Sequence, residues 1–169
     1  MAALLPALGD GARLWLFAVD GGDDAVVPDL RAFARTWQSH GRPVPADVAD
    51  VAPAGFPGVV LAVAAELSDD EVNAGVSGCG IDAMEHAVAA AVARAGAHLV
   101  PALSVVYSDA DGWHVVPRPA FRALVRSGAA GAQTVVLDLT PTTLGALRRD
   151  GVARQAAASW HGRAFRLAA

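Results

Sequence analysis

The sequence VVLAVA at residues 59–64 is the strongest strand signal in the chain. An uninterrupted run of apolar residues that is rich in valine is typical of a strand with both faces buried. The residues just before it, Pro53, Gly55, Pro57 and Gly58, mark a turn. The stretch therefore predicts a buried strand that the chain enters through a turn.

Other segments are predicted to be strands around this one. Residues 13–19 (RLWLFAV) form a second apolar run, which a turn with the sequence DGG ends. Residues 44–52 have a weaker pattern and predict an edge strand. Residues 103–107 and 113–116 flank the sequence DADG, which is typical of a hairpin turn. Residues 134–139 predict a further buried strand.

Helices alternate with these strands along the chain. Pro28 is placed to open a helix at its first turn. Gly41 is placed to end that helix, which puts His40 at its last turn. Its buried face is predicted to consist of Leu30, Phe33, Ala34 and Trp37. Further helices are predicted at residues 82–95, 119–127 and 141–149, with part of the last stretch up to Phe165 also helical.

Hairpins mixed with helices indicate an α+β fold rather than a doubly wound parallel sheet. We expect a mixed, mostly antiparallel sheet of about five or six strands, with helices packed mainly on one face. No repeat, low-complexity linker or boundary divides the chain, so residues 1–169 are predicted to form a single domain.

The composition excludes several classes of protein. A chain of 169 residues with a single Cys has no internal disulfide framework, which fits a reducing compartment. All 13 basic residues are arginine. Without lysine, the chain has no Walker A phosphate loop, no Schiff-base lysine and no cofactor linked through lysine. No cofactor is predicted.

Charge is unevenly distributed along the chain. Residues 1–111 hold 15 of the 17 acidic residues, whereas residues 112–169 hold 8 of the 13 arginines. The two parts either lie side by side and neutralise each other, or the second part presents a face that binds anions. With a pI near 5.6, the chain is not expected to bind nucleic acid.

No membrane segment is expected. The most apolar long window, residues 83–106, contains Glu85, His86, Arg94 and Pro101, and a spanning helix tolerates few or no charges. The first residues lack a basic region of the kind found in signal peptides. We therefore predict a cytoplasmic protein without a membrane partner.

Residues 77–86 (SGCGIDAMEH) are the best candidate for a functional site. Asp82 and Glu85 resemble a capping box, which places Cys79 in the loop just before a helix. The positive end of a helix favours a thiolate, and free backbone N–H groups there can hold an anion. The glycines beside the thiol let the backbone approach a ligand closely. The candidate ligand-binding residues in this loop are Ser77, Gly78 and Gly80.

The helix after this loop places His86 outside the apolar stripe formed by Ile81, Met84 and Val88. Asp82 lies four residues before His86, so the two side chains can touch. We therefore predict Cys79 as a nucleophile, His86 or His40 as its base, Asp82 as the residue that orients His86, and backbone amides as an oxyanion hole.

Simpler interpretations stay open for these residues. A single Cys is most often a buried apolar side chain. Zinc would need Cys79 with His86, His40 and His161, but no pair has a typical ligand spacing, so no metal is predicted. Residues 75–79 approach the nucleophile elbow G-x-S-x-G without its last glycine. A regular four-residue spacing relates Arg118, Arg122 and Arg126, and their side chains either bind phosphate or face solvent.

These motifs together resemble a family of small uncharacterised bacterial proteins. Their pattern is W-x-x-H-G, then S-G-C-S-I-D with a histidine four residues after the aspartate, then a tail with Trp and His. Here WQSHG lies at 37–41, SGCGID at 77–82 and SWH at 159–161, so the resemblance spans most of the chain. Gly80 stands where the pattern has serine, which removes one hydroxyl donor.

Members of that family often carry the name "ABC transporter ATPase", which a chain without a phosphate-loop lysine does not support. The resemblance implies a cytosolic domain of unknown activity. It singles out, without assigning roles, Trp37, His40, Ser77, Gly78, Cys79, Asp82, His86 and Trp160.

Three kinds of function follow from the sequence. The first is cysteine-dependent acyl transfer or hydrolysis at residues 77–82, and the second is a non-catalytic module that binds a small anionic ligand with the same loop. The third is a homo-oligomeric interaction protein with tryptophans at its interface. Trp160 and His161 are expected to dock on Trp37 and His40 as one wall of a ligand pocket, with Arg163 or Arg166 at its mouth.

Overall fold

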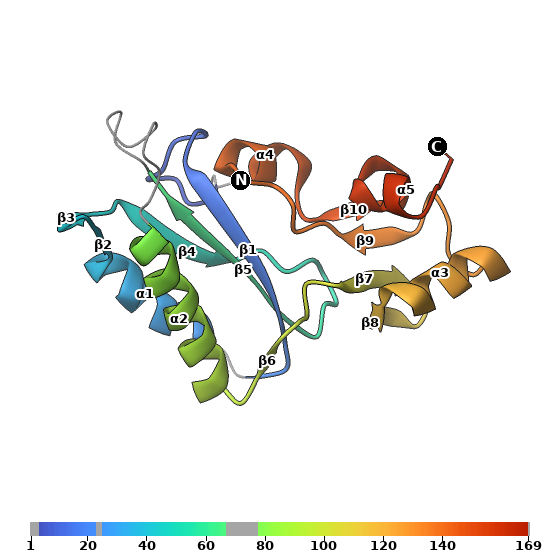
Figure 1. Cartoon of the computed structure of the whole chain (residues 1–169), viewed down its shortest axis with the longest axis horizontal. Coiled ribbons are helices and arrows are strands. Elements are labelled where there is room, and N and C mark those ends of the chain that lie inside the picture. Colours follow the sequence, from blue (N-terminus) through green and yellow to red (C-terminus); the bar gives the residue numbers. More distant parts are fainter. Residues whose placement is uncertain (1–3, 23–24, 67–77, 169) are drawn as a thin grey trace.

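The computed structural model of the chain describes residues 4–22, 25–66 and 78–168 (Figure 1). In this part of the chain, the strands form two four-stranded antiparallel sheets and one two-stranded ribbon. The first sheet has the order β4 (Ala46–Asp50), β5 (Gly58–Ala65), β1 (Arg13–Asp20) and β6 (His98–Leu99). The second has the order β10 (Ala153–Gln155), β9 (Val135–Leu137), β7 (Ser104–Asp109) and β8 (Gly112–Pro117).

The α+β class is confirmed, but the expectation of one sheet with five or six strands is wrong. Two sheets form because residues 98–104 leave the first sheet after the short β6 and start β7 in the second. The segment 44–52 is confirmed as an edge strand, β4. The predicted hairpin is confirmed as well, with Asp109 paired to Gly112 across its turn.

Between the charged ends of β1, strands β1 and β5 are apolar because the two faces of their sheet cover different cores. Val19, Leu61 and Val63 face a core shared with two helices. The residues between them along the strands face a second core, which also contains Val106 and Leu137 of the second sheet. Alternation along each strand thus sends successive side chains into opposite layers.

Helices α1 (Val26–Thr36) and α2 (Gly78–Arg94) lie together on one face of the first sheet (Figure 1). Their buried residues, such as Leu30 and Met84, join the core below that face. This agrees with the expected packing of helices on one face. The opposite face packs against the second core.

The prediction that the first helix runs to Gly41 is wrong. Helix α1 ends at Thr36, and Trp37 takes an extended backbone conformation. His40 and Gly41 instead form the two-residue turn between β2 (Gln38–Ser39) and β3 (Arg42–Pro43), with φ angles of 52° and 72°. Positive φ at both positions is typical of a tight hairpin turn, and glycine suits that turn as well as it suits a helix end.

The second sheet has helices on its outer side. Val105, Tyr107 and Val136 pack in a third core with Phe121 of α3 (Arg118–Ser127) and Phe165, which caps α5 (Trp160–Ala164). A 3-10 turn, Ala156–Ala158, precedes α5, so the prediction that the tail is partly helical is confirmed. Figure 1 shows α3 and α5 at the end of the molecule remote from β2 and β3.

The N-terminal segment is held against α4 (Leu144–Asp150). The guanidinium of Arg148 donates hydrogen bonds to the carbonyl oxygens of Leu4, Leu5 and Leu8, and it also pairs with Asp10. Within the described residues, no helix is both long and apolar enough to cross a membrane.

Candidate functional site

The predicted thiol site lies at the start of α2. The described part of this helix begins at Gly78, so Cys79 belongs to its first turn and not to a loop before it. Asp82 therefore lies within the helix, and the prediction that it caps the N-terminus is wrong. Cys79 is a free, exposed cysteine, so it is not a buried apolar side chain. Ser77 is outside the described residues.

Trp37 is joined directly to this helix start. Its indole Nε1–H donates a 3.0 Å hydrogen bond to the carbonyl oxygen of Gly80. The ring is only 2% exposed and packs edge-on against Trp15, with ring centroids 5.8 Å apart. The structure thus brings Trp37 and Gly80 together, and it leaves Trp37 too buried to lie at a protein interface.

The predicted contact between the side chains of Asp82 and His86 is replaced by a backbone contact. The Nδ1–H of His86 donates a 2.7 Å hydrogen bond to the carbonyl oxygen of Asp82, and this fixes the proton of the neutral ring on Nδ1. Among the described residues, no hydrogen bond joins Cys79 to His86 or to His40. His40 is exposed on its hairpin turn.

The candidate zinc ligands are not gathered into one site. His161 lies in α5, in contact with Phe121 of the third core, whereas Cys79 and His86 lie on α2. The part of the chain that the structure describes contains no group of three or more His, Cys, Asp or Glu residues placed to hold a metal ion.

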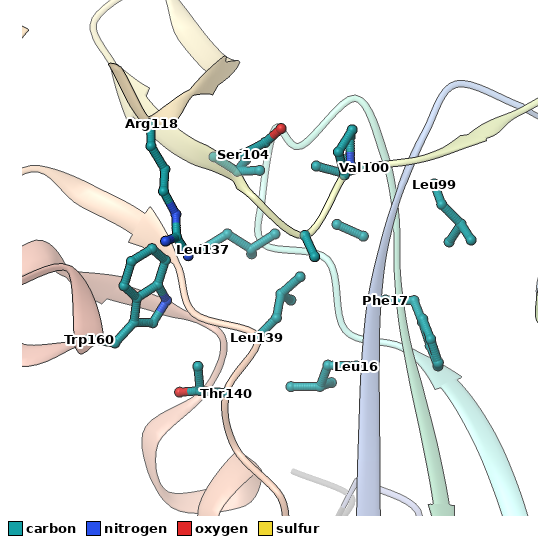
Figure 2. A pocket seen from close by; sticks show the side chains of 14 residues that line it. Leu16, Phe17, Leu99, Val100, Ser104, Arg118, Leu137, Leu139, Thr140 and Trp160 are labelled. Atoms are coloured by element: carbon teal, nitrogen blue, oxygen red, sulfur yellow. The ribbon is translucent and has the colours of Figure 1, made fainter. Parts of the chain in front are cut away.

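A well-formed hollow lies elsewhere, between the two sheets (Figure 2). This inter-sheet cavity has a volume of about 650 Å³, within the usual range for small-molecule sites. Its walls come from β1, from the crossing segment 99–104, from β7 and β9, and from Arg118 and Trp160. The lining residues are Leu16, Phe17, Ala18, Leu99, Val100, Pro101, Ala102, Ser104, Val106, Arg118, Leu137, Leu139, Thr140 and Trp160.

One wall of the inter-sheet cavity is an open strand edge. On the side away from β5, the N–H of Leu14 donates to Thr142, and the C=O of Ala18 accepts from Val100. The N–H and C=O of Leu16 lie midway between these groups and point to the same side, because backbone direction alternates along a strand. Among the described residues, no strand pairs with Leu16 there. The edge therefore offers one donor and one acceptor.

The polar end of the inter-sheet cavity is formed by Arg118. Its guanidinium lies over the ring of Trp160, 4.9 Å from the centroid, and Figure 2 shows both side chains at one end of the cavity. Arg118 forms no ion pair with any described residue. It is the first residue of α3, whose first turn contains no acidic side chain. Positive charge is thus left uncompensated beside an apolar space.

A buried polar network supports this end of the cavity. Asp138, only 1% exposed, accepts hydrogen bonds from both the N–H and the hydroxyl of Thr140, at 3.0 and 2.6 Å. Its second carboxylate oxygen pairs with Arg154 at 3.3 Å. Thr140 itself lines the cavity, so these bonds fix the wall on that side.

His161 lies behind the same wall and is kept neutral. It is 1% exposed and shares a 2.8 Å hydrogen bond with Ser159, the cap of α5. Burial lowers the pKa of His161 to about 4; the nearby Asp138 opposes this shift and Arg118 adds to it. His161 therefore supports Trp160 from behind, and it does not line the cavity.

The predicted position of the tail is wrong in part. Trp160 does form a cavity wall, but it packs on the third core beside Phe165. Trp37 belongs to the core on the far side of the first sheet. Arg118 is the arginine at this cavity, in place of Arg163 or Arg166.

The sequence predicted Trp160 as a pocket wall, but it singled out Arg118 only as part of an arginine stripe and did not predict the apolar walls. Leu16 is far in the chain from the adjacent pair Leu139 and Thr140, and none of the three belongs to a motif. Pro101, between β6 and β7, is the one local signal, because proline has no N–H to donate and so interrupts strand pairing at that point.

The chain matches no protein-family description, and neither a curated protein nor a solved structure matches it at a significant level.

Proposed function

We propose that this protein binds a small amphipathic molecule with an anionic group, such as a carboxylate, in the inter-sheet cavity. The observation that carries the proposal is the unpaired guanidinium of Arg118 beside a large and mainly apolar space. The apolar body of the ligand would contact Leu16, Phe17 and Leu139, and its anionic group would meet Arg118.

The cavity also suits one further polar group on the ligand. The open edge at Leu16 supplies a backbone donor and acceptor, which an amide or hydroxyl group would satisfy. This proposal keeps the idea of a binding module for a small anion but places it in the inter-sheet cavity, away from residues 77–82.

Calorimetric titration with decanoate and with uncharged decanol tests the charge. Arg118→Gln removes the charge and leaves a shorter, neutral polar side chain. We expect it to weaken decanoate binding about tenfold or more and to leave decanol binding unchanged, since a hydrogen bond to a charged group contributes about 1.5–3 kcal/mol. An equal loss of affinity for decanoate and decanol would contradict the role of Arg118.

A matched pair of variants tests the location. Ala102 lines the cavity, whereas its neighbour Leu103 is 69% exposed and does not. Ala102→Trp should fill the space and abolish decanoate binding, and Leu103→Trp should leave it intact. Decanoate bound equally well by both variants would show that its site lies elsewhere.

A second candidate function, cysteine-dependent acyl transfer or hydrolysis, stays a proposal for Cys79. It is favoured by an exposed thiol in the first turn of α2, where the helix dipole favours negative charge. The Nδ1–H of His86 is engaged, so its Nε2 is the ring nitrogen able to take a proton.

Iodoacetamide labelling at neutral pH tests this second function, with Cys79→Ser as the unlabelled control. An activated thiol should react faster in the folded protein than in urea. Slower labelling of the folded protein would exclude the catalytic proposal, and it would have no bearing on decanoate binding.

A further inference from the structure

A second hollow lies between α3 and the end of α5, on the outer side of the second sheet. We call it the arginine groove. Its volume is about 430 Å³, and it shares no lining residue with the inter-sheet cavity. The arginine groove is lined by Arg122, Val125, Arg126, Ala164, Phe165 and Arg166.

The positive charges around the arginine groove are not neutralised by the chain itself. None of its three arginines forms an ion pair with a described residue. Residues 112–169 contain two acidic residues, and both form ion pairs with other arginines, Asp138 with Arg154 and Asp150 with Arg149. Like charges gathered around one hollow repel each other, so an anion bound between them is favoured.

Arg166 has a backbone conformation that is unfavourable for residues with a side chain. Its φ is 55°, in the left-handed region. Its N–H donates to the carbonyl of Arg163 at 3.4 Å, and the N–H of Leu167 donates to the carbonyl of Gly162 at 2.9 Å. This pair of bonds is the Schellman motif that ends a helix, and its left-handed position is normally glycine.

The same chain uses glycine at the equivalent positions of two other helices. Gly96 after α2 has φ 67° and Gly128 after α3 has φ 78°, and each ends its helix with the same pair of hydrogen bonds. Arginine at position 166 is therefore a departure from the rule this protein otherwise follows. Strained residues of this kind cluster at functional sites.

The opposite side of the arginine groove is also held in place. The guanidinium of Arg122 lies over the ring of Phe165, 5.9 Å from its centroid. Phe165 packs edge-on against the fully buried Phe121, with centroids 4.9 Å apart. Stacking on a fixed ring limits the freedom of the Arg122 side chain, which lowers the entropy lost when it binds a ligand.

We propose that the arginine groove binds the phosphate group of a small phosphomonoester. Guanidinium groups match phosphate oxygens with paired hydrogen bonds, and Arg122, Arg126 and Arg166 approach the groove from two separate segments. Val125 and Phe165 offer apolar contact to the organic part of the ligand.

Titration of the full chain with inorganic phosphate and with phenyl phosphate tests the proposal. We expect phenyl phosphate to bind more tightly, because its ring contacts the apolar side of the arginine groove. Arg166→Gly should weaken binding of both ligands about tenfold or more, and it should raise the melting temperature because it relieves the left-handed strain. Arg35→Gln removes an exposed arginine of α1 and should change neither property.

Several results would overturn the proposal. Unchanged phosphate affinity in both Arg166→Gly and Arg122→Gln would exclude the arginine groove as the site. A loss in Arg35→Gln as large as in Arg166→Gly would indicate general charge attraction only. Inorganic phosphate bound as tightly as phenyl phosphate would exclude the phosphomonoester. Decanoate binding should be unaffected by Arg166→Gly, which separates this site from the inter-sheet cavity.

Discussion

Acid should destabilise the folded protein through His161. The folded protein holds this buried ring neutral with a pKa of about 4, whereas an unfolded chain has a histidine pKa near 6.5. Between these values the unfolded state binds more protons, so the free energy of unfolding falls as the pH falls. Integrated between pH 7.5 and pH 4.5, this difference amounts to about 2.5 kcal/mol.

Urea unfolding at pH 7.5, 6.5, 5.5 and 4.5 measures this effect when the protein is compared with His161→Gln. Other groups titrate equally in both proteins, so the difference between the two curves isolates His161. The variant should be the less stable protein at pH 7.5 because it loses packing against Phe121 and Trp160. That deficit should shrink by about 2.5 kcal/mol at pH 4.5. Parallel curves would refute the argument.

Three further substitutions test the fold. Gly58→Ala would place a Cβ 2.0 Å from the carbonyl oxygen of Val19, so the free energy of unfolding in urea should fall by about 3 kcal/mol or more. Gly11→Ala is the control, because the space there is open, and it should lower the free energy of unfolding by about 0.5 kcal/mol or less. Arg148→Met removes the donors that hold three carbonyls of the N-terminal segment, and limited proteolysis should then cut that segment faster. Thr143→Ala removes the cap of α4 and should cost about 1 kcal/mol in the same unfolding assay.

The two long buried strands were the most predictable part of the fold. Apart from Arg13, residues 13–19 and 59–64 are continuous apolar runs, and such a run has few alternatives to a buried strand. Their register aligns Leu16 with Ala62, so the alternating faces of the two strands coincide. The apolar pattern that identifies these two strands lies within each segment, so it can be read from the sequence alone.

The division into two sheets could not be predicted from the sequence. Strand patterns identify segments, but they do not say which segments pair. The strands β6, β9 and β10 have two or three residues each, too few to show a period. Gly41 illustrates the same limit, because a positive φ serves a hairpin turn and a helix end alike.

The candidate site was only partly predictable, for a related reason. The Gly-Cys-Gly sequence drew attention to Cys79 because its residues are adjacent in the chain. The inter-sheet cavity is built from Leu16, Leu139 and Trp160, which are ordinary residues until the fold brings them together. The Arg166 strain was equally hidden, since only the backbone conformation distinguishes it from any surface arginine.

The uneven distribution of charge is not matched, within the described ranges, by close ion pairs between the two parts of the chain. Among the ion pairs of arginines with described carboxylates, Arg148 with Asp10 alone joins residues 1–111 to residues 112–169. Most arginines of the second part thus have no acidic partner in the described structure. The described acidic residues of the first part do not pair with these arginines, which stay available to the proposed anionic ligands.

Helix α3 divides these arginines between two hollows. Arg118 lines the inter-sheet cavity, whereas Arg122 and Arg126 line the arginine groove, and the buried Phe121 lies between them on the helix. The two hollows share no residue, so their ligands should bind independently. Arg118→Gln should weaken decanoate binding and spare phenyl phosphate, and Arg122→Gln should do the reverse. If either variant weakened both ligands to the same extent, α3 would instead serve one continuous site.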